Sequence, residues 1–367
     1  MMYDSELIPV SIGLLYDGMV VPHDIYDGDQ KFLLIRAGKT LSASQIETIR
    51  HINRGKDTIR VSVETRRMML EHEFPSDIGR QAKLERETGY TEIKNETLTL
   101  YEDIQNTSAV QQDTIHEVSE RLVHRLEVVK PGLILDLINA LAPVDEYLQR
   151  HCINVSLLNG LIGRWLSLSK DEIDLLVLIG LMHDCGKALL PPQILSAPRP
   201  LTVAEYEVIK MHPVQSYELL AELPANVRHG ACAHHEKTGG QGYPYGLLGP
   251  DIPITARITA VSDIYDAMVS RRAYKYPQSP FHIMAQLRRM CETELDPLIV
   301  DTFTSNMPKE LVNKAVTLSN GELGVIYAID PDDLEYPVIK TGNQVVKSSR
   351  DLYCVSMCGE EEQDADG

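Results

Sequence analysis

Apolar residues at helical spacing dominate the middle of the chain. From residue 131 to about 318 they recur three and four positions apart or form long apolar runs, which predicts a mainly helical domain. The helices that we expect are Leu133–Leu141, Glu146–Leu166, Lys170–His183, Thr202–His212, Ala225–Glu236, Ile254–Ser270, Pro280–Glu294 and Pro297–Met307. Thr202 followed by Glu205 matches the T-x-x-E capping box, a pattern typical of a helix start.

The N-terminal residues 1–65 have a different pattern, in which short apolar runs alternate with turn signals. This alternation predicts a small mixed α/β or β-rich domain. We expect an extended segment at Lys31–Ile35, a short helix at Ser42–His51 and a closing strand at Thr58–Val63. No catalytic constellation is visible in this part of the sequence.

Residues 66–130 are polar and are predicted to connect this domain to the helical one. Within them, apolar side chains at helical spacing predict an amphipathic helix over Gln111–Val129. Its apolar stripe would either join two copies as a homodimer or pack on its own domain, and both readings stay open. After the helical domain (131–318), residues 319–358 predict a short β-rich segment, and the acidic residues 359–367 predict a disordered tail.

Composition and charge narrow the classes of function. A content of 43% hydrophobic and 24% charged residues is ordinary for a soluble globular protein. The longest apolar run, Leu175–Met182, is far shorter than the ~20 residues of a membrane span, and the N-terminus lacks secretory-signal character. We therefore expect a cytoplasmic protein. Its six cysteines contain no C-x-x-C pair, so neither a zinc finger nor a disulfide framework is expected.

The formal charge of −18 argues against binding of a nucleic-acid polymer, which needs a basic surface. A small anionic substrate remains compatible with the sequence. It would require a local positive site, built from metal ions and a few Lys or Arg side chains.

Histidine and aspartate residues with the chemistry of metal ligands gather in the helical region. His183 and Asp184 end an almost wholly apolar predicted helix, where an unpaired buried carboxylate would cost several kcal/mol. A bound metal removes that cost. His234 and His235 follow four small residues, and two adjacent imidazoles on a helix would point ~100° apart into one cavity. Asp263 adds a carboxylate on a largely apolar helix.

Five imidazoles and two carboxylates, once His151 and His212 are counted, supply enough ligands for two divalent transition-metal ions. Asp184 is the natural bridge between them. Nitrogen and oxygen ligands without thiolate suit iron, manganese, nickel or zinc, and we rank iron first. Two such ions ~3.5–4 Å apart form a hydrolytic centre in which a bridging water loses a proton to become the hydroxide nucleophile.

Three strings in this region resemble the signatures of one known family. HDCGK, residues 183–187, resembles the HD-x-GK signature of the HD-domain metal-dependent phosphohydrolases. HHEKTGGQGYP, residues 234–244, resembles the HHE…GYP signature of the HD-GYP branch, and SDIYDAMVSRRAYK, residues 262–275, resembles its D-x-x-DA…R-x-YK segment. The resemblance covers about residues 131–315 in the same order and implies an HD-domain helical bundle.

This resemblance also implies roles for individual residues. The ligands of the first metal would be His151, His183, Asp184 and Asp263, and those of the second Asp184, His212, His234 and His235.

The residues that would meet the substrate follow from the same resemblance. Lys187 matches a lysine near the scissile phosphate, where it would stabilise charge or donate a proton to the leaving oxygen. Arg272 and Lys275 match basic residues that contact the substrate's phosphates. The GYP loop, which contacts substrate or partner proteins in the family, corresponds to Gly242, Tyr243 and Pro244.

The sequence departs from the family pattern at three positions. Tyr147 stands where some members carry a glutamate that holds a third metal, and the neighbouring Glu146 would point ~100° away, so we expect two ions. Cys185 replaces an aliphatic residue and is predicted to serve packing. Gly239 replaces a common aspartate and is predicted to alter the mobility of the GYP loop.

The function implied is hydrolysis of a phosphodiester bond in cyclic di-GMP, giving linear pGpG and then GMP. Diguanylate cyclases or other signalling proteins are the partners that the GYP loop would bind. One alternative is an HD hydrolase acting on another nucleotide. The other is a non-catalytic sensor of cyclic di-GMP or a scaffold for signalling partners.

Overall fold

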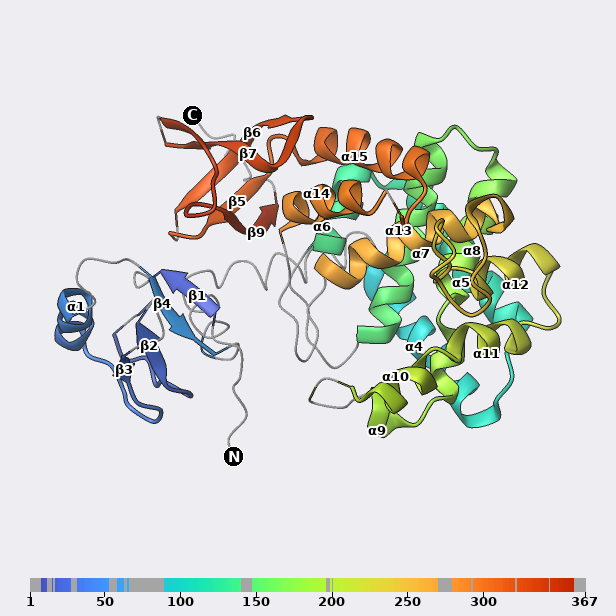
Figure 1. Ribbon diagram of the computed structural model, residues 1–367, viewed down its shortest axis with the longest axis horizontal. Coiled ribbons are helices and arrows are strands. Elements are labelled where there is room, and N and C mark those ends of the chain that lie inside the picture. The colour runs from blue at the N-terminus through green and yellow to red at the C-terminus, as the bar shows by residue number, and fades with distance from the viewer. Residues whose placement is uncertain are drawn as a thin grey trace. The chain divides into compact units, whose positions relative to one another are not determined.

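The computed structural model describes most of the chain. The residues described are 8–11, 15, 17–27, 32–52, 58–62, 65, 89–139, 147–195, 199, 201–269, 279–291, 293–320, 322–342 and 344–359. The chain divides into two compact units, one made of Met1–Lys83, Asn313–Ala328 and Val338–Gly367, the other of Leu84–Val312 and Ile329–Pro337. Figure 1 labels the elements of each.

In its described residues, the N-terminal part contains a four-stranded antiparallel sheet and the helix α1. Its elements are β1 (Ile8–Ser11), β2 (Ile25–Asp27), β3 (Leu33–Ile35), α1 (Ala43–Ile52) and β4 (Thr58–Val61). The strand order is β1-β4-β2-β3, and Ile8 pairs with Val61 at the end of the β1–β4 ladder. Buried Met19, Val21, Ile25 and Ile59 belong to its core. The predicted mixture of strands and a short helix is confirmed, whereas the contacts group this part with Asn313–Ala328 and Val338–Gly367 in one unit.

The C-terminal sheet is also antiparallel in the pairings described. Its strands are β5 (Ala315–Leu318), β6 (Leu323–Asp330), β7 (Asp333–Thr341), β8 (Gln344–Lys347) and β9 (Cys354–Gly359), in the order β8-β7-β6-β5-β9. All four residues of β5 are buried, as expected for a strand with neighbours on both edges. The predicted β-rich C-terminal segment is therefore present, and the acidic residues 360–367 lie outside the described part.

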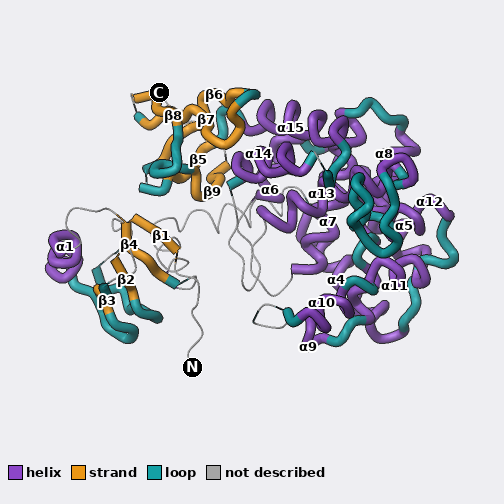
Figure 2. The backbone as a smooth tube through the Cα atoms, in the orientation of Figure 1, coloured by secondary structure: helices purple, strands orange, loops and turns teal. Residues whose placement is uncertain are grey.

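The second unit is almost entirely helical (Figure 2). In chain order its helices are α4 (Tyr90–Thr107), α5 (Gln112–Val128), α6 (Pro131–Asn139), α7 (Tyr147–Trp165), α8 (Lys170–Met182), η3 (Cys185–Leu189), α9 (Pro192–Leu195), α10 (Val203–Ile209), α11 (His212–Leu219), α12 (Ala225–Cys232), η4 (Gly249–Asp251), α13 (Ile254–Val269), α14 (Pro280–Met290) and α15 (Pro297–Leu311). Within the described residues, no helix is both long and apolar enough to span a membrane.

Helices α7 and α8 pack closely and form the centre of this unit. A capping box starts α8, since Ser169 accepts from the Glu172 backbone N–H and Glu172 bonds back to Ser169. Leu176 through Met182 are all buried. Buried polar side chains on α7 join the two helices: Ser156 Oγ donates to the Val177 carbonyl at 2.9 Å, and Asn159 Nδ2 donates to the Leu176 carbonyl at 3.0 Å.

The amphipathic helix α5 packs inside its own unit. Its buried residues include Ile115, Val118, Leu122 and Leu126, and the helix contacts α7 and α8. This is the second of the two readings that the sequence left open. Because the apolar stripe is covered within one chain, a homodimer would have to use another surface.

The close approach of α7 and α8 requires a glycine at position 180. A Cβ at Gly180 would lie 2.6 Å from the Ser156 Cα and 2.7 Å from the Ser156 backbone nitrogen, far inside van der Waals contact. Gly180→Ala should therefore lower the free energy of unfolding by about 1–3 kcal/mol, the usual cost of overpacking. Urea denaturation checks this.

Gly249→Ala is the matched control, because the nearest atoms to its Cβ would lie 3.6 Å away. It should shift the unfolding free energy by less than about 0.5 kcal/mol. Equal effects of the two substitutions would show that the α7–α8 contact does not demand glycine.

Candidate metal centre

The His-Asp turn lies where α8 ends. His183 is the C-cap of α8, Asp184 precedes η3, and both side chains are fully buried. Ser216 on α11 holds this turn: its Oγ donates to the His183 carbonyl at 3.0 Å and accepts from the Gly186 N–H at 2.9 Å. A Cβ at Gly186 would collide with the His212 carbonyl, so glycine is required for η3 to approach α11.

Three of the predicted ligands share one local arrangement. The Nδ1 atoms of His183, His212 and His234 each bond a backbone carbonyl three residues earlier, at 2.7, 2.7 and 2.6 Å. A carbonyl can only accept, so each Nδ1 carries the proton. In the neutral ring, Nε2 is then left as a bare acceptor facing the centre, which is the form that binds a metal.

His151 on α7 is oriented by carboxylates of α13. Its Nδ1 lies 2.7 Å from Asp266 Oδ2, and its Nε2 lies 3.1 Å from Asp263 Oδ1. Asn154 Nδ2 donates to the other oxygen of Asp266 at 2.7 Å, and Tyr90 Oη donates to Asn154 Oδ1 at 2.9 Å. The Asp266 side chain therefore positions the imidazole from behind, as the outer partners of metal ligands do.

The two oxygens of Asp184 face different sets of histidines. Oδ2 lies 3.5 Å from His151 Nε2 and 3.4 Å from His183 Nε2, whereas Oδ1 lies 3.1 Å from His212 Nε2 and 3.8 Å from His234 Nε2. Within each set the ligand atoms lie within 4.8 Å of one another; the sets are His151, His183 and Asp184, and Asp184, His212, His234 and His235. Asp263 lies beside both, with Oδ2 3.8 Å from His235 Nδ1.

Burial sets the protonation of the second set. It lowers the pKa of His212, lowers that of His234 well below its usual value, and lowers that of His235 to about 3. For Asp184, burial acts to raise the pKa, but the Lys187 ammonium and the His183 and His212 rings outweigh it and hold the pKa well below its usual range. Neutral imidazoles around an ionised carboxylate are the ligand-competent forms.

The pKa of His151 moves in the opposite direction. Burial acts to lower it, but hydrogen bonds to Asp263 and Asp266 outweigh burial and raise the pKa to about 9. The carboxylates around His151 therefore favour positive charge at this position.

Unsatisfied lone pairs show that this centre fits a cation. Asp184 Oδ1 is buried without a hydrogen-bond partner in the described structure. His212 Nε2 and His234 Nε2, both without a proton, lie 3.5 Å apart beside it. Acceptors that face one another in a buried site repel unless positive charge lies between them. The donor set is imidazole and carboxylate, which suits divalent transition metals, so this His/Asp cluster is able to bind metal ions.

The GYP loop covers one side of the centre. The Tyr243 ring stacks on His235 with centroids 4.6 Å apart, and the Tyr243 N–H donates to the His235 carbonyl at 3.2 Å. A Cβ at Gly242 would collide with the Lys237 backbone nitrogen, so the loop needs glycine there. The Tyr243–Pro244 bond is cis.

Glu236 holds the same loop from within the fold. Its side chain is buried, and its two oxygens accept from the backbone N–H groups of Tyr245 at 2.7 Å and Leu247 at 2.9 Å. Gly239 N–H bonds the Thr293 carbonyl at 3.0 Å, and a Cβ at Gly239 would lie 2.7 Å from that oxygen. The aspartate that is common at this position in the family would therefore require a different backbone path for the loop.

Most of the predicted site residues lie around this centre, in places that differ locally from expectation. His212 begins the separate helix α11, and does not end the predicted helix Thr202–His212, because α10 stops at Ile209. His234 and His235 lie beyond α12, which ends at Cys232. The prediction that both stand on a helix was wrong, and the turn brings both rings to the centre. Cys185 is buried, in keeping with a packing role.

Arg272 and Lys275 lie outside the described residues, as does Glu146; nothing is described of the Tyr147 side chain.

Sequence reasoning gave no role to the residues that support the ligands. Asp266 stands one turn after Asp263, and Glu236 directly follows the histidine pair. Their positions next to predicted ligands could have indicated a supporting role for both. Asn154 and Ser216 had none, because an isolated Asn or Ser is common on any helix.

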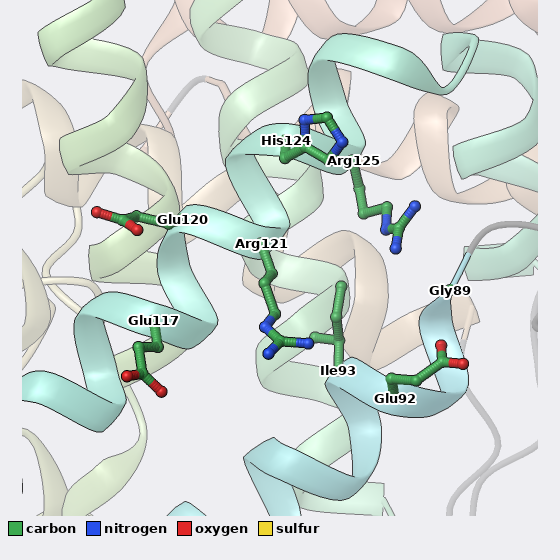
Figure 3. Close-up of a pocket in the computed structure, with 8 residues that line it drawn as sticks. All are labelled: Gly89, Glu92, Ile93, Glu117, Glu120, Arg121, His124 and Arg125. Carbon is green, nitrogen blue, oxygen red and sulfur yellow. The ribbon is translucent and has the colours of Figure 1, made fainter.

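A separate cavity of about 430 Å³ lies between α4 and α5 (Figure 3). Its lining residues are Gly89, Glu92, Ile93, Glu117, Glu120, Arg121, His124 and Arg125. Charges of both signs meet there, and Arg121 pairs with Glu96 at 2.9 Å. None of the predicted ligands lines this cavity, and it plays no part in the metal centre.

The role of Glu236 can be tested in the protein without substrate. Glu236→Ala removes the acceptor of two backbone N–H groups, and hydrogen bonds to a charged group contribute about 1.5–3 kcal/mol each. Amide hydrogen exchange at Tyr245 and Leu247 should therefore accelerate at least tenfold, while the buried amides of α8 keep their protection. Unchanged exchange at both positions would contradict this role.

Comparison with known proteins shows which proteins this chain resembles around the centre. The HD domain family model matches residues 137–299. The cyclic di-GMP phosphodiesterase PA4108 of Pseudomonas aeruginosa is 32% identical over 233 residues, 62% of this chain and 54% of that protein. The 3'3'-cGAMP-specific phosphodiesterase 2 of Vibrio cholerae is 31% identical over 173 residues, 46% of this chain and 33% of that protein. The chain thus spans about half or less of the length of these curated relatives.

The fold also has a counterpart among solved structures. The HDG"Y"P protein Bd1817 from Bdellovibrio bacteriovorus matches with a TM-score of 0.51 and 13% identity, covering 82% of this chain and 99% of that one. At this identity the match concerns the fold alone. The matched HD domain, the curated relative and the HD-x-GK and HHE…GYP strings make this part of the chain similar to the HD-GYP family.

Proposed function

We propose that this protein is a metal-dependent phosphodiesterase that hydrolyses cyclic di-GMP. The observation that carries the proposal is the buried Asp184 carboxylate, whose two oxygens face separate histidine sets. One carboxylate between two sets of ligands suits a binuclear centre, and paired metal ions are suited to phosphoryl chemistry.

The residues that would hold two ions fall into two overlapping sets. The first set is His151, His183, Asp184 and Asp263, and the second is Asp184, His212, His234 and His235. Two ions, with iron ranked first, would activate water as the nucleophile and neutralise charge on the substrate's phosphate. We propose two ions and not three, because the sequence offers Tyr147 where a third would need a carboxylate.

Exposure indicates the side from which substrate would enter. The side chains of His151, His183, Asp184, His212 and His234 are at most 1% exposed. His235 is 23% exposed, and its ring is stacked under Tyr243 of the GYP loop. A phosphodiester would therefore reach the ions past this loop, with Gly242, Tyr243 and Pro244 at the entrance.

Lys187 is a basic residue in direct contact with the centre. Its ammonium contacts Asp184 Oδ2, and 18% of its side chain is exposed, so it lies between the buried carboxylate and the outside. From there it would stabilise negative charge on the phosphate and donate a proton to the leaving oxygen. Arg272 and Lys275 would contact phosphate outside the metal ligands, a role that comes from the family resemblance.

The relatives support a cyclic dinucleotide as the substrate class. The Pseudomonas protein is named for cyclic di-GMP and the Vibrio protein for 3'3'-cGAMP. Cyclic di-GMP is our first choice and 3'3'-cGAMP the second. Hydrolysis of one phosphodiester of cyclic di-GMP gives linear pGpG, and a second cleavage gives GMP.

The decisive experiment pairs metal analysis of protein purified without oxygen with turnover of both cyclic dinucleotides, followed by product chromatography. We expect two ions per chain and pGpG formed faster than any product from 3'3'-cGAMP. Normal binding of cyclic di-GMP without turnover, with iron, manganese or nickel supplied under reducing conditions, would instead establish a sensor.

Asp184→Ala removes the carboxylate shared by both ligand sets. Metal content should fall together with turnover, by several orders of magnitude, because both ions depend on the same side chain. Asp301→Ala, on the exposed face of α15, is the matched control and should keep metal and activity. Full turnover in the Asp184 variant would refute the bridging assignment.

Lys187→Ala separates chemistry from metal binding. A protonated lysine is not a ligand, so both ions and cyclic di-GMP binding should remain, while kcat falls by ~10²-fold, the scale of losing one strong stabiliser of developing charge. Lys309→Ala, an exposed lysine in α15, serves as control. Loss of metal from the Lys187 variant would instead assign the side chain a structural role at Asp184.

A further inference from the structure

Helix α10 places an aromatic ring and a cation beside the GYP loop. The Lys210 ammonium, just after α10, lies 5.8 Å from the centroid of the Tyr206 ring and 6.0 Å from the centroid of the Tyr243 ring. Both distances are within reach of cation–π attraction. Tyr206, Lys210 and Tyr243 therefore form one continuous group, which we call the α10 wall.

The α10 wall reaches the metal centre through Tyr243. That ring stacks on His235 and lies 6.5 Å from the His212 ring, centroid to centroid. One ring, Tyr243, therefore lies close to both the Lys210 ammonium and the metal ligands. The wall thus extends outward from the exposed side of the centre.

The outer part of the wall is open to solvent. Tyr206 is 49% exposed, and no residue of α10 is buried. Glu207 Oε1 lies 2.7 Å from Lys210 Nζ, and 29% of the Lys210 side chain is exposed. An aromatic ring that packs little and lies under an ordered ammonium contributes little to the core. Its open face has the chemistry that stacks on a nucleobase, and the ammonium has the chemistry that meets phosphate.

The size of a cyclic dinucleotide explains why the centre would need such a wall. The molecule carries two bases and two phosphates, and only one phosphate can lie at the ions. The partly exposed side of the centre is that of His235 and the GYP loop, and Lys210 and Tyr206 are adjacent to this side. On a chain of formal charge −18, a positive side chain on this side would offset repulsion of the second phosphate.

We propose that Tyr206 and Lys210 form a subsite for the half of a cyclic dinucleotide that is not being cleaved, in which Tyr206 stacks on a purine base and Lys210 meets the non-scissile phosphate. This subsite rests on the proposed function and deepens it. It makes α10 a specificity element that selects a dinucleotide over a short phosphodiester or free phosphate.

The test measures the dissociation constant for cyclic di-GMP on metal-loaded protein by calorimetry, with inorganic phosphate as the probe that has no base. Tyr206→Ala should weaken cyclic di-GMP binding about tenfold, the scale of losing one base–aromatic stack, and leave phosphate binding and metal content unchanged. Tyr206→Phe should bind like wild type. Val203→Ala is the matched control, because Val203 lies on the same helix and is 80% exposed.

Lys210→Ala should weaken cyclic di-GMP binding severalfold and reduce its dependence on salt, because a screened charge pair is lost. Wild-type affinity in Tyr206→Ala, or equal weakening for cyclic di-GMP and phosphate, would overturn the subsite while the proposed function stands. Wild-type protein that binds but does not cleave cyclic di-GMP overturns the proposed function, and the binding comparison still decides the subsite. Absence of both binding and cleavage overturns the two together.

Discussion

The buried charge of Asp184 is the constraint on which the helical unit depends. Its side chain has no exposed surface, and an ionised carboxylate without water costs several kcal/mol unless positive charge offsets it. The chain brings one ammonium to Oδ2, and Oδ1 is left without a hydrogen-bond donor in the part of the chain described. The site therefore has an unmet demand for positive charge, which divalent cations are suited to meet.

Backbone carbonyls orient three of the histidines toward this carboxylate. Three rings use Nδ1 to bond the carbonyl three residues earlier, and such carbonyls are available because each ring follows or starts a helical turn. One local rule thus fixes the tautomer and points Nε2 inward without any further side chain. His151 lies inside α7, where the backbone carbonyls accept the hydrogen bonds of the helix itself. Its Nδ1 is instead bonded to the Asp266 carboxylate, which orients the ring.

Close backbone packing brings these turns to one point. Gly186 lets η3 meet α11, Gly180 lets α8 meet α7, and Gly242 lets the GYP loop fold back on the histidine pair. Glu236 then ties the loop by two backbone N–H groups. The GYP loop beside the centre is built on this support, so its shape depends on residues outside the two ligand sets.

The sequence by itself determined the helices of the HD domain, since the spacing of apolar residues is a local property. It also determined the residue types of the centre, since imidazole and carboxylate groups are metal ligands wherever the fold places them. It could not place the end of α10 or of α12, because a helix end depends on which carbonyls find partners elsewhere. Nor could it choose a partner for the apolar stripe of α5 or identify α4, whose apolar positions are interspersed with Thr and Glu. Only tertiary contacts decided these, and only they brought Ser216 to the His183 carbonyl and Asn154 to Asp266.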